Sequence, residues 1–197
     1  VRIAGVDEAG RGPLAGPLVA AAVVPAKPVE GLNDSKQLTP ERREAIYAAL
    51  HDGTHAVGVA VVSSEEIDRR GIQRANYGAM IEAALALDPP PDFLLVDGFR
   101  LPACPLPPRR IVKGDCRSLS IAAASVVAKV TRDRIMEAMD ARWPDYGFAR
   151  HKGYATPEHL DALARLGPCP IHRMSFAPMA RRPETGLLFG GDGEEGP

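Results

Sequence analysis

The sequence has few cysteines, few aromatic residues and no long apolar run. Its 3 cysteines, Cys104, Cys116 and Cys169, form no C-x-x-C pair, which argues against a disulfide framework and against a zinc site. No stretch is apolar enough over enough residues to span a bilayer, and the start of the sequence lacks the basic and apolar regions of a signal peptide. These absences predict a cytoplasmic protein with free thiols.

An excess of charge of one sign is also lacking, because the formal net charge of the 197 residues is only -1. The acidic residues are partly concentrated in residues 184–197, and the rest of the sequence carries 24 basic against 21 acidic residues. An apolar content of 45% and a charged content of 25% are ordinary for a globular domain and indicate neither disorder nor a membrane protein. A weakly basic body is compatible with a nucleic-acid enzyme without requiring one.

Apolar runs alternate with helix signals along the sequence, which predicts an α/β or α+β layer fold with one mixed sheet. The length predicts one domain over residues 1–182, with a helical C-terminal part from about residue 141 to 182, and a flexible acidic and glycine-rich tail at 183–197. Residues 146–156 are expected to form a loop. Strands are predicted at 2–8, 18–24, 55–62, 93–98 and 109–115, and helices at 40–50, 73–87, 118–139 and 157–166.

Acidic residues end three of the predicted strands. They are the pair Asp7-Glu8, then Asp97 and Asp115. Strand ends on one edge of a sheet are where α/β folds place their chemistry, and carboxylates gathered there repel one another unless cations lie among them. Oxygen ligands without a His or Cys cluster select Mg²⁺ or Mn²⁺, and pairs of such ions about 3.5–4 Å apart serve phosphodiester hydrolysis. Each acid could instead be a turn former or an ion-pair partner.

Two neighbouring strand residues point to opposite faces of a sheet. Asp7 and Glu8 therefore cannot both face one site from a regular strand. Either the strand loses its regularity at this point, or Glu8 reaches round from the strand end with its longer side chain. The sequence leaves both possibilities open.

A glycine-flanked arginine, Gly10-Arg11-Gly12, follows the acid pair. Glycine allows backbone to come close to a ligand, so the turn is suited to a phosphodiester. The spacing Gly10-x-Gly12-x-x-Ala15 also matches the dinucleotide fingerprint loosely. That reading is disfavoured, because Pro13 and the glycines lead into another strand rather than a helix, and no acid ends a next strand about 20 residues on.

A series of motifs along the sequence resembles the bacterial type 2 ribonuclease H family, ribonuclease HII. The resemblance covers about residues 2–180 and follows the order of the family's motifs. It implies a ribonuclease-H-like mixed five-stranded sheet flanked by helices, with a C-terminal helical segment. The matching segments are GVDEAGRGPLAG (5–16), LNDSK (32–36), VDG (96–98), VKGD (112–115), SIAAASVVAKVTRD (120–133), YGF (146–148), HKGY (151–154) and HRMSF (172–176).

The resemblance implies an endoribonuclease that cleaves the RNA strand of RNA–DNA hybrids. It also implies cleavage at single ribonucleotides embedded in duplex DNA, leaving 5′-phosphate and 3′-hydroxyl ends, in replication-linked repair. Mg²⁺ or Mn²⁺ is the expected cofactor, and a monomer is the expected state. The alternatives are a hybrid-binding module without catalysis and a metal-dependent nuclease with another substrate.

Carried over position by position, the resemblance implies two groups of site residues. The expected catalytic metal ligands are Asp7, Glu8, Asp97 and Asp115. The turn formed by Gly10, Arg11 and Gly12 is expected to recognise the ribose 2′-hydroxyl, with Tyr154 stacking on the sugar next to the ribonucleotide and Lys36 near phosphate. The 2′-hydroxyl is the group that separates RNA from DNA at one site.

Other charged residues have weaker roles. Asp133 is interpreted as a surface charge on a helix rather than a ligand. His151 could bind phosphate, and the pair His172-Arg173 could hold the C-terminal segment against the site, although purely structural roles explain them equally well. A basic flank suited to a duplex backbone is expected from Arg109, Arg110, Lys113 and Arg117.

The tail contains a short apolar motif, residues 186–189, in polar surroundings. It could dock on a sliding clamp. An incidental apolar patch is the competing interpretation.

Overall fold

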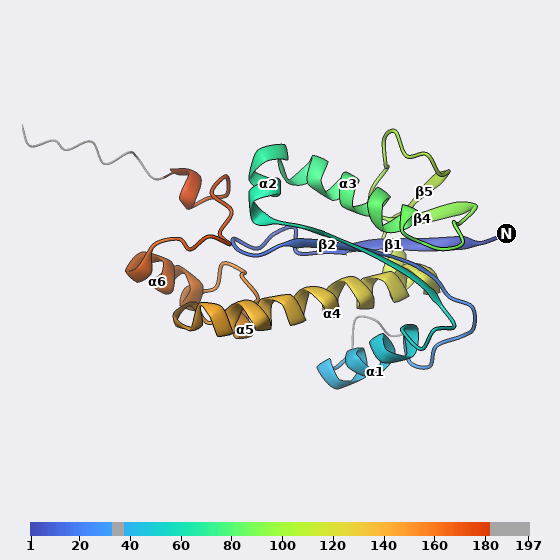
Figure 1. The fold of residues 1–197 in the computed structure, drawn as a ribbon, viewed down its shortest axis with the longest axis horizontal. Coiled ribbons are helices and arrows are strands. Elements are labelled where there is room, and N and C mark those ends of the chain that lie inside the picture. Colours follow the sequence, from blue (N-terminus) through green and yellow to red (C-terminus); the bar gives the residue numbers. More distant parts are fainter. Residues whose placement is uncertain (33–37, 182–197) are drawn as a thin grey trace, which may run out of the picture.

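The computed structural model describes residues 1–32 and 38–181, in which helices cover both faces of a five-stranded mixed sheet (Figure 1). The strand order is β3-β2-β1-β4-β5; β1 pairs with β2 and β2 with β3 antiparallel, whereas β1–β4 and β4–β5 are parallel. The strands are β1 (Ile3–Ala9), β2 (Leu18–Val24), β3 (Ala56–Val62), β4 (Phe93–Asp97) and β5 (Pro108–Ile111). The α-helices are α1 (Pro40–Leu50), α2 (Ser64–Arg70), α3 (Ile72–Leu85), α4 (Leu119–Arg142), α5 (Phe148–His151) and α6 (Pro157–Leu166).

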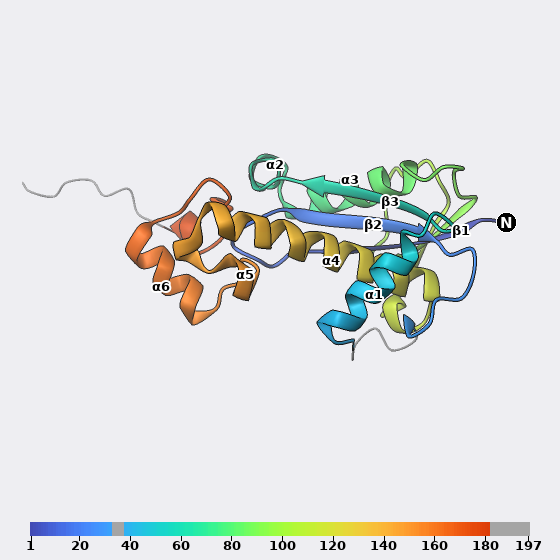
Figure 2. The same cartoon turned by 60° about the horizontal axis from the view of Figure 1, so that its bottom comes forward.

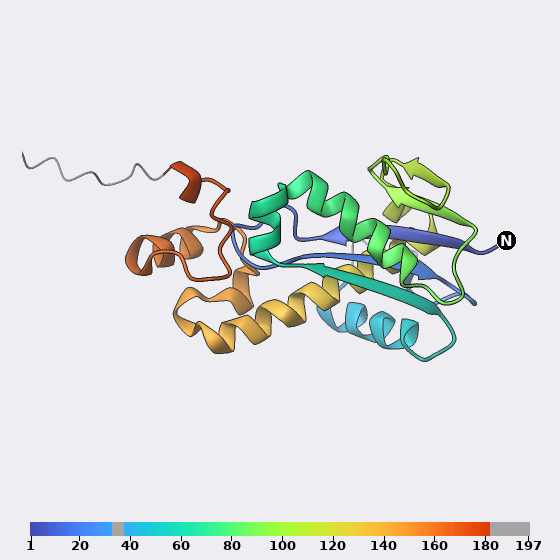
Figure 3. The same ribbon diagram turned by 45° about the horizontal axis from the view of Figure 1, so that its top comes forward.

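Each face of the sheet has its own apolar core. Helices α2 and α3 lie over one face (Figure 3), and α4 with α1 covers the other (Figure 2). Ala4 and Val6 of β1 belong to the core under α3, whereas the small side chains of α4 pack against β2 on the opposite face. Gly5 lets α4 come close to β1, because a Cβ there would lie 2.0 Å from the carbonyl carbon of Ser120.

Helix starts follow the local sequence signals. Thr39 caps α1 by accepting a hydrogen bond from the amide of Arg42 at 3.3 Å, and Thr156 caps α6 in the same way. A proline occupies the first turn of both helices, where its missing N–H costs nothing. The predicted bounds of α1 and α6 are therefore confirmed.

Three predictions about the elements that carry the site are wrong in detail. Asp7 and Glu8 lie inside β1 rather than at its end, because the β1–β2 pairing continues as far as Ala9. The fifth strand ends at Ile111, where β4 also ends, so no paired neighbour supports an extension of β5 to Asp115. Asp115 instead lies in a 3₁₀ turn that spans Gly114–Cys116.

The C-terminal part is more helical than predicted. The expected loop at 146–156 contains α5 and is preceded by a 3₁₀ turn at Pro144–Tyr146. In Figure 1 this part lies at the C-terminal end of α4, with α6 beyond it. The predicted tail at 183–197 and its apolar motif lie outside the described residues, so the boundary at 182 stays a prediction. Among the helices of the described ranges, none is long and apolar enough to cross a membrane.

Candidate active site

Parallel pairing of β1 with β4 brings two carboxylates together. Val6 pairs with Val96, and both side chains belong to the core under α3. The next residue of each strand, Asp7 and Asp97, therefore points to the α4 face from adjacent strands. Asp7 is only 7% exposed, and the hydroxyl of Ser125 on α4 contributes a hydrogen bond that lowers its pKa.

Glu8 leaves β1 on the opposite face. The strand is regular through Ala9, so a loss of regularity at the acid pair, one of the two possibilities that the sequence left open, is excluded. The amide of Glu8 donates to Oδ1 of Asp7 at 2.8 Å, and its carboxylate lies 3.9 Å from Nε of Arg11. We call Asp7, Glu8 and Asp97 the carboxylate edge.

The carboxylate edge is electrostatically crowded. Burial raises the pKa of Asp7 well above its usual value, and the charges of Glu8 and Asp97 raise it further. Burial also raises the pKa of Glu8 to about 7, with Arg11 opposing this rise and Asp97 adding to it. A hard divalent cation would relieve this repulsion and match the all-oxygen donor set. As the side chains stand in residues 1–32 and 38–181, however, no group of three or more His, Cys, Asp or Glu is arranged to hold a metal ion.

Asp115 is connected to the carboxylate edge by the preceding residue, Gly114. The amide of Gly114 donates to Oδ1 of Asp97 at 2.6 Å, so the 3₁₀ turn that holds Asp115 is tied to β4. Asp115 is half-buried and lines an open hollow of about 270 Å³ together with Leu32 and Ser118. Another hollow, of about 560 Å³, surrounds Ile3 at the opposite end of β1 and is separate from the carboxylates. The open hollow beside Asp115 suits a polymer substrate better than an enclosed small molecule.

The turn at residues 10–12, here called the recognition turn, lies beside Tyr154. A Cβ on Gly12 would lie 3.9 Å from Cε1 of the tyrosine ring. Gly10 has φ +93°, and a Cβ there would lie 2.1 Å from Nε of Arg132, so glycine is required. Tyr154 is 46% exposed, and the guanidinium carbon of Arg132 lies 5.8 Å from its ring centroid.

The side chain of Arg11 turns back toward the carboxylate edge. Besides its ion pair with Glu8, it donates to Oε1 of Gln73 at 3.1 Å, and its guanidinium carbon lies 4.5 Å from the ring centroid of Phe99. Arg11 thus links the recognition turn to Glu8 and to α3. Backbone groups of the turn, rather than this side chain, are therefore the better candidates for contact with a ligand.

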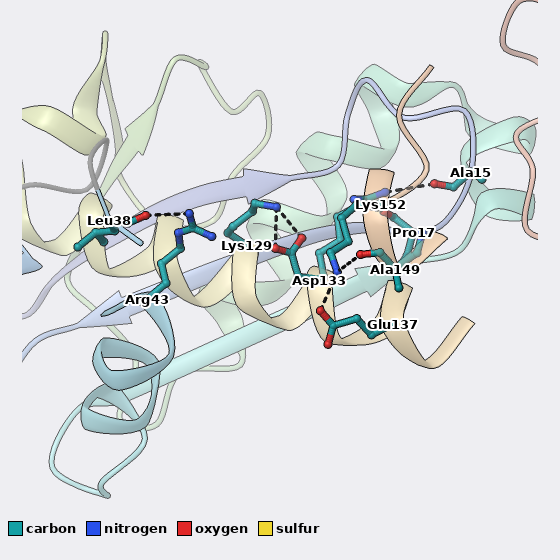
Figure 4. Close-up of polar contacts among 10 residues, drawn as sticks. Ala15, Pro17, Leu38, Arg43, Lys129, Asp133, Glu137, Ala149 and Lys152 are labelled. Atoms are coloured by element: carbon teal, nitrogen blue, oxygen red, sulfur yellow. Dashed lines mark hydrogen bonds and ion pairs between the residues drawn. The ribbon is translucent and has the colours of Figure 1, made fainter. Parts of the chain in front are cut away.

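The structure also tests the weaker assignments. Asp133 pairs with Lys129 one turn away on α4, with Nζ–O distances of 2.6 and 2.7 Å (Figure 4), and its side chain is only 20% exposed, so it is a partly buried ion-pair partner rather than a fully exposed surface charge. His151 is 7% exposed, and both ring nitrogens are engaged, with the carbonyl of Tyr146 and the amide of Gly153. His151 is therefore not available to phosphate. Lys36 lies outside the described residues.

Sequence reasoning missed several residues around the site. Ser125 belongs to the small-residue run of α4. Its hydroxyl is a polar group within an otherwise apolar stretch of the sequence, and this could have marked it as a site residue. Gln73 was assigned only to a helix. His159 was also missed, because its ring joins the carbonyl of Tyr154 to the ring of His172, and these three groups meet only in the folded chain.

Comparison with known proteins agrees with this architecture. The family model described as Ribonuclease HII matches residues 4–179. The chain belongs to the ribonuclease HII family. A protein named Ribonuclease HII from Geobacillus kaustophilus is 59% identical over 180 residues, which cover 90% of this chain and 69% of that protein.

Solved structures give the same result for the fold. The ribonuclease H2 of Pyrococcus horikoshii OT3 has a TM-score of 0.78 and 30% identity, and the match covers 92% of this chain and 96% of that one. The ribonuclease HII of Archaeoglobus fulgidus, solved in a complex with PCNA, has a TM-score of 0.77 and 29% identity over 89% of this chain and 95% of that one. The predicted ribonuclease-H-like fold is confirmed. Membership of the ribonuclease HII family makes the protein a hydrolase with endoribonuclease activity on RNA–DNA hybrids.

Proposed function

We propose that the protein cleaves at single ribonucleotides embedded in duplex DNA as well as along RNA–DNA hybrids, leaving 5′-phosphate and 3′-hydroxyl ends. The observation that carries this proposal is that exposed Gly12 of the recognition turn lies next to Tyr154, with Arg11 linking that turn to Glu8. In this proposal the groups that recognise the sugar and the carboxylates that hold the metal are connected through Arg11. If one 2′-hydroxyl is recognised beside the carboxylates, a single ribonucleotide is enough to fix the position of cleavage.

The catalytic residues in this proposal are Asp7, Glu8, Asp97 and Asp115. Burial, with further contributions from neighbouring carboxylate charges, raises the pKa values of Asp7 and Glu8, and this supports a role in holding divalent cations, because a cation would stabilise the buried ionised carboxylates. Mg²⁺ or Mn²⁺ suits this oxygen-only set. Two such ions supply water activation and neutralise charge on the phosphodiester.

Recognition of the substrate falls to the turn and its surroundings. Backbone amides of residues 10–12 are suited to a 2′-hydroxyl, which can donate and accept hydrogen bonds without regard to the base. The exposed ring of Tyr154 offers a flat surface for the neighbouring sugar. Around the site, the exposed side chains of Arg109, Arg110, Lys113 and Arg117 supply positive charge for the duplex backbone.

The wider setting also belongs to the proposal. The protein would act as a cytoplasmic monomer in ribonucleotide removal linked to replication. The apolar tail motif at residues 186–189 would contact a sliding clamp, a contact class that the complex of the Archaeoglobus relative with PCNA supports. Lys36 would lie near a phosphate of the bound strand.

A cleavage assay on three matched duplexes tests the proposal. The duplexes are all-DNA, DNA with one embedded ribonucleotide, and a long RNA–DNA hybrid, each with Mg²⁺, Mn²⁺ or EDTA. We expect cleavage of the two ribonucleotide-containing duplexes with either metal and none in EDTA, with a 5′-phosphate on the downstream product. Cleavage of the hybrid alone would refute the single-ribonucleotide activity, and cleavage of all-DNA would point to a different nuclease.

Metal binding has its own readout, independent of turnover. A cation at 100 times its Kd stabilises a folded protein by about 2.7 kcal/mol, which for a domain of this size raises Tm by roughly 5–10 °C. We expect Mg²⁺ or Mn²⁺ to raise Tm in this way, and Asp7→Asn to abolish the shift. An equal shift in that variant would place the cation elsewhere.

A further inference from the structure

The segment around residues 171–173 is hydrogen-bonded to the residues that directly follow the recognition turn. The amide of Arg173 donates to the carbonyl of Leu14, and the amide of Gly16 donates to the carbonyl of Ile171, both at 2.8 Å. From the other side, the amide of Leu14 donates to the carbonyl of Gly153 at 2.8 Å. The turn, the loop that bears Tyr154 and the C-terminal segment are therefore joined by backbone hydrogen bonds.

Arg173 reaches from this segment into the turn itself. Its fully buried guanidinium donates to the carbonyls of Gly10, Arg11 and Gly16, at 2.6, 3.0 and 2.9 Å respectively, and Nε makes a further bond to Gly16 at 3.1 Å. Burial and the nearby charge of Arg132 lower the pKa of Arg173 to about 9. The backbone carbonyls of Gly10, Arg11 and Gly16 thus stabilise the buried guanidinium cation.

These bonds determine which way the turn presents its amides. In a trans peptide the C=O and the following N–H point in opposite directions. The carbonyls of Gly10 and Arg11 face Arg173, so the amides of Arg11 and Gly12 are directed to the other side. Gly12 is exposed there and lies beside the ring of Tyr154.

His172 is connected to Tyr154, on the other side of the recognition turn, by a chain of hydrogen bonds. Nδ1 of His172 lies 2.9 Å from the amide nitrogen of Cys169 and 3.2 Å from its carbonyl oxygen, and we assign the ring proton of His172 to Nε2 because the shorter contact has the amide as donor. Nε2 lies 3.0 Å from Nε2 of His159, which therefore accepts, and Nδ1 of His159 then donates to the carbonyl of Tyr154 at 2.8 Å. The chain of bonds requires both rings to be neutral.

We propose that His172 and Arg173 are positioning residues that hold the recognition turn and Tyr154 together as one rigid surface for the ribonucleotide. Adjacent residues of one extended segment point to opposite sides, so a single dipeptide reaches both halves. The proposal rests on the proposed function for the role of that surface. Neither residue touches the substrate in it.

The discriminating measurement is a ratio of two dissociation constants. Binding is compared between all-DNA duplex and the same duplex with one ribonucleotide, with Ca²⁺ in place of Mg²⁺ and with product formation checked to be absent. A loss of folded protein changes both constants equally and leaves their ratio intact. Only a change in recognition of the 2′-hydroxyl alters the ratio of the two dissociation constants.

Arg173→Lys keeps the charge but not the fork that binds three carbonyls at once. We expect it to lower the preference for the ribonucleotide by about tenfold, the effect of losing a charge-assisted hydrogen-bond set. Hydrogen exchange in residues 10–17 should accelerate in the same variant. A folded Arg173→Lys protein with unchanged preference and unchanged exchange in the turn would overturn the proposal.

His172 allows a rescue test with two isosteric amides. Asn places a polar atom where Nδ1 lies and so keeps the Cys169 contact, whereas Gln places a donor near Nε2 and so keeps the His159 contact. We expect His172→Asn to lower the preference by about fivefold and His172→Gln to retain it within about twofold. Equal effects of both variants would refute the role of the histidine chain.

Tyr146→Phe is the matched control. It removes a buried hydrogen bond to the carbonyl of Gly167, 2.7 Å long, in the same C-terminal region but with no contact to the turn. We expect a lower Tm with unchanged preference; loss of preference here would show that any destabilisation suffices and would overturn the proposal. If the unaltered protein itself shows no preference, the proposed function fails, and hydrogen exchange in residues 10–17 still decides whether Arg173 holds the turn.

Discussion

The carboxylate edge and the recognition turn are neighbours in the sequence, yet they differ in how their buried polar groups are compensated. At the edge, Asp7 and Asp97 lie on adjacent strands, and burial together with the charges of Glu8 and Asp97 raises the pKa of Asp7. In the turn, the buried charge of Arg173 is met by the carbonyls of Gly10, Arg11 and Gly16. In the proposed function an external cation completes the edge, whereas the protein itself supplies the partners of the turn.

This difference separates what each region contributes to folding. Crowded carboxylates cost folding free energy in the absence of metal, so their neutralisation should leave the fold intact. Removing a donor from the turn leaves buried carbonyls without partners, which destabilises the protein. Activity and stability should therefore be separable at the edge and coupled near the turn.

The largest expected effect is that of Asp97→Asn. Loss of a carboxylate that neutralises and holds cations removes several kcal/mol of transition-state stabilisation, so kcat/KM should fall by about 10³-fold. The amide oxygen still accepts from Gly114, so Tm should change little. Asp133→Asn is the control, because it makes the same change at a partly buried ion pair on α4. Cleavage by Asp97→Asn at the rate of the control would remove Asp97 from the site.

The second prediction concerns opposite pH dependences of stability, measured by urea unfolding in EDTA. Glu8 has its pKa raised from 4.5 to about 7, so the folded state binds the extra proton, and stability from this group is lost as pH rises through that range. Burial lowers the pKa of His172 from 6.5 to about 4, so stability from this group is lost as pH falls through that range. Each amounts to about 3 kcal/mol.

The two contributions oppose each other in the unaltered protein, and single variants expose them. Glu8→Gln should be more stable than the unaltered protein at pH 7, with the difference shrinking toward pH 4.5. His172→Gln should be less stable at pH 7 and approach the unaltered protein near pH 4. Differences that do not vary with pH would contradict the electrostatic contrast between the two regions.

The smallest expected effect is that of Tyr154→Ala. A stacking contact is worth about 1–3 kcal/mol, so cleavage at a single ribonucleotide should fall by about tenfold or somewhat more. The ring is 46% exposed, so Tm should change far less than in a variant of the buried Arg173. Tyr154→Phe keeps the ring and should keep the activity. Full activity of the alanine variant would exclude stacking by Tyr154.

Much of the fold was predictable because its signals are local. The Thr-Pro starts of α1 and α6 and the alternation of apolar runs with helix signals depend on residues close in the sequence. The end of β5 was not predictable, because it depends on where β4 stops. The same holds for the continuation of β1 through its acids, which its pairing with β2 maintains.

The sequence by itself determined which chemical groups the protein has: oxygen donors after apolar runs, a glycine-flanked arginine and a tyrosine in a motif that resembles one family. The tertiary structure decided how they are arranged. Strand register sets Asp7 beside Asp97, and a segment more than 150 residues away supplies the guanidinium that binds Gly10. The physical reason is that side-chain identity is a local property, whereas register, burial and the partners of a buried charge depend on segments that meet only in the folded chain.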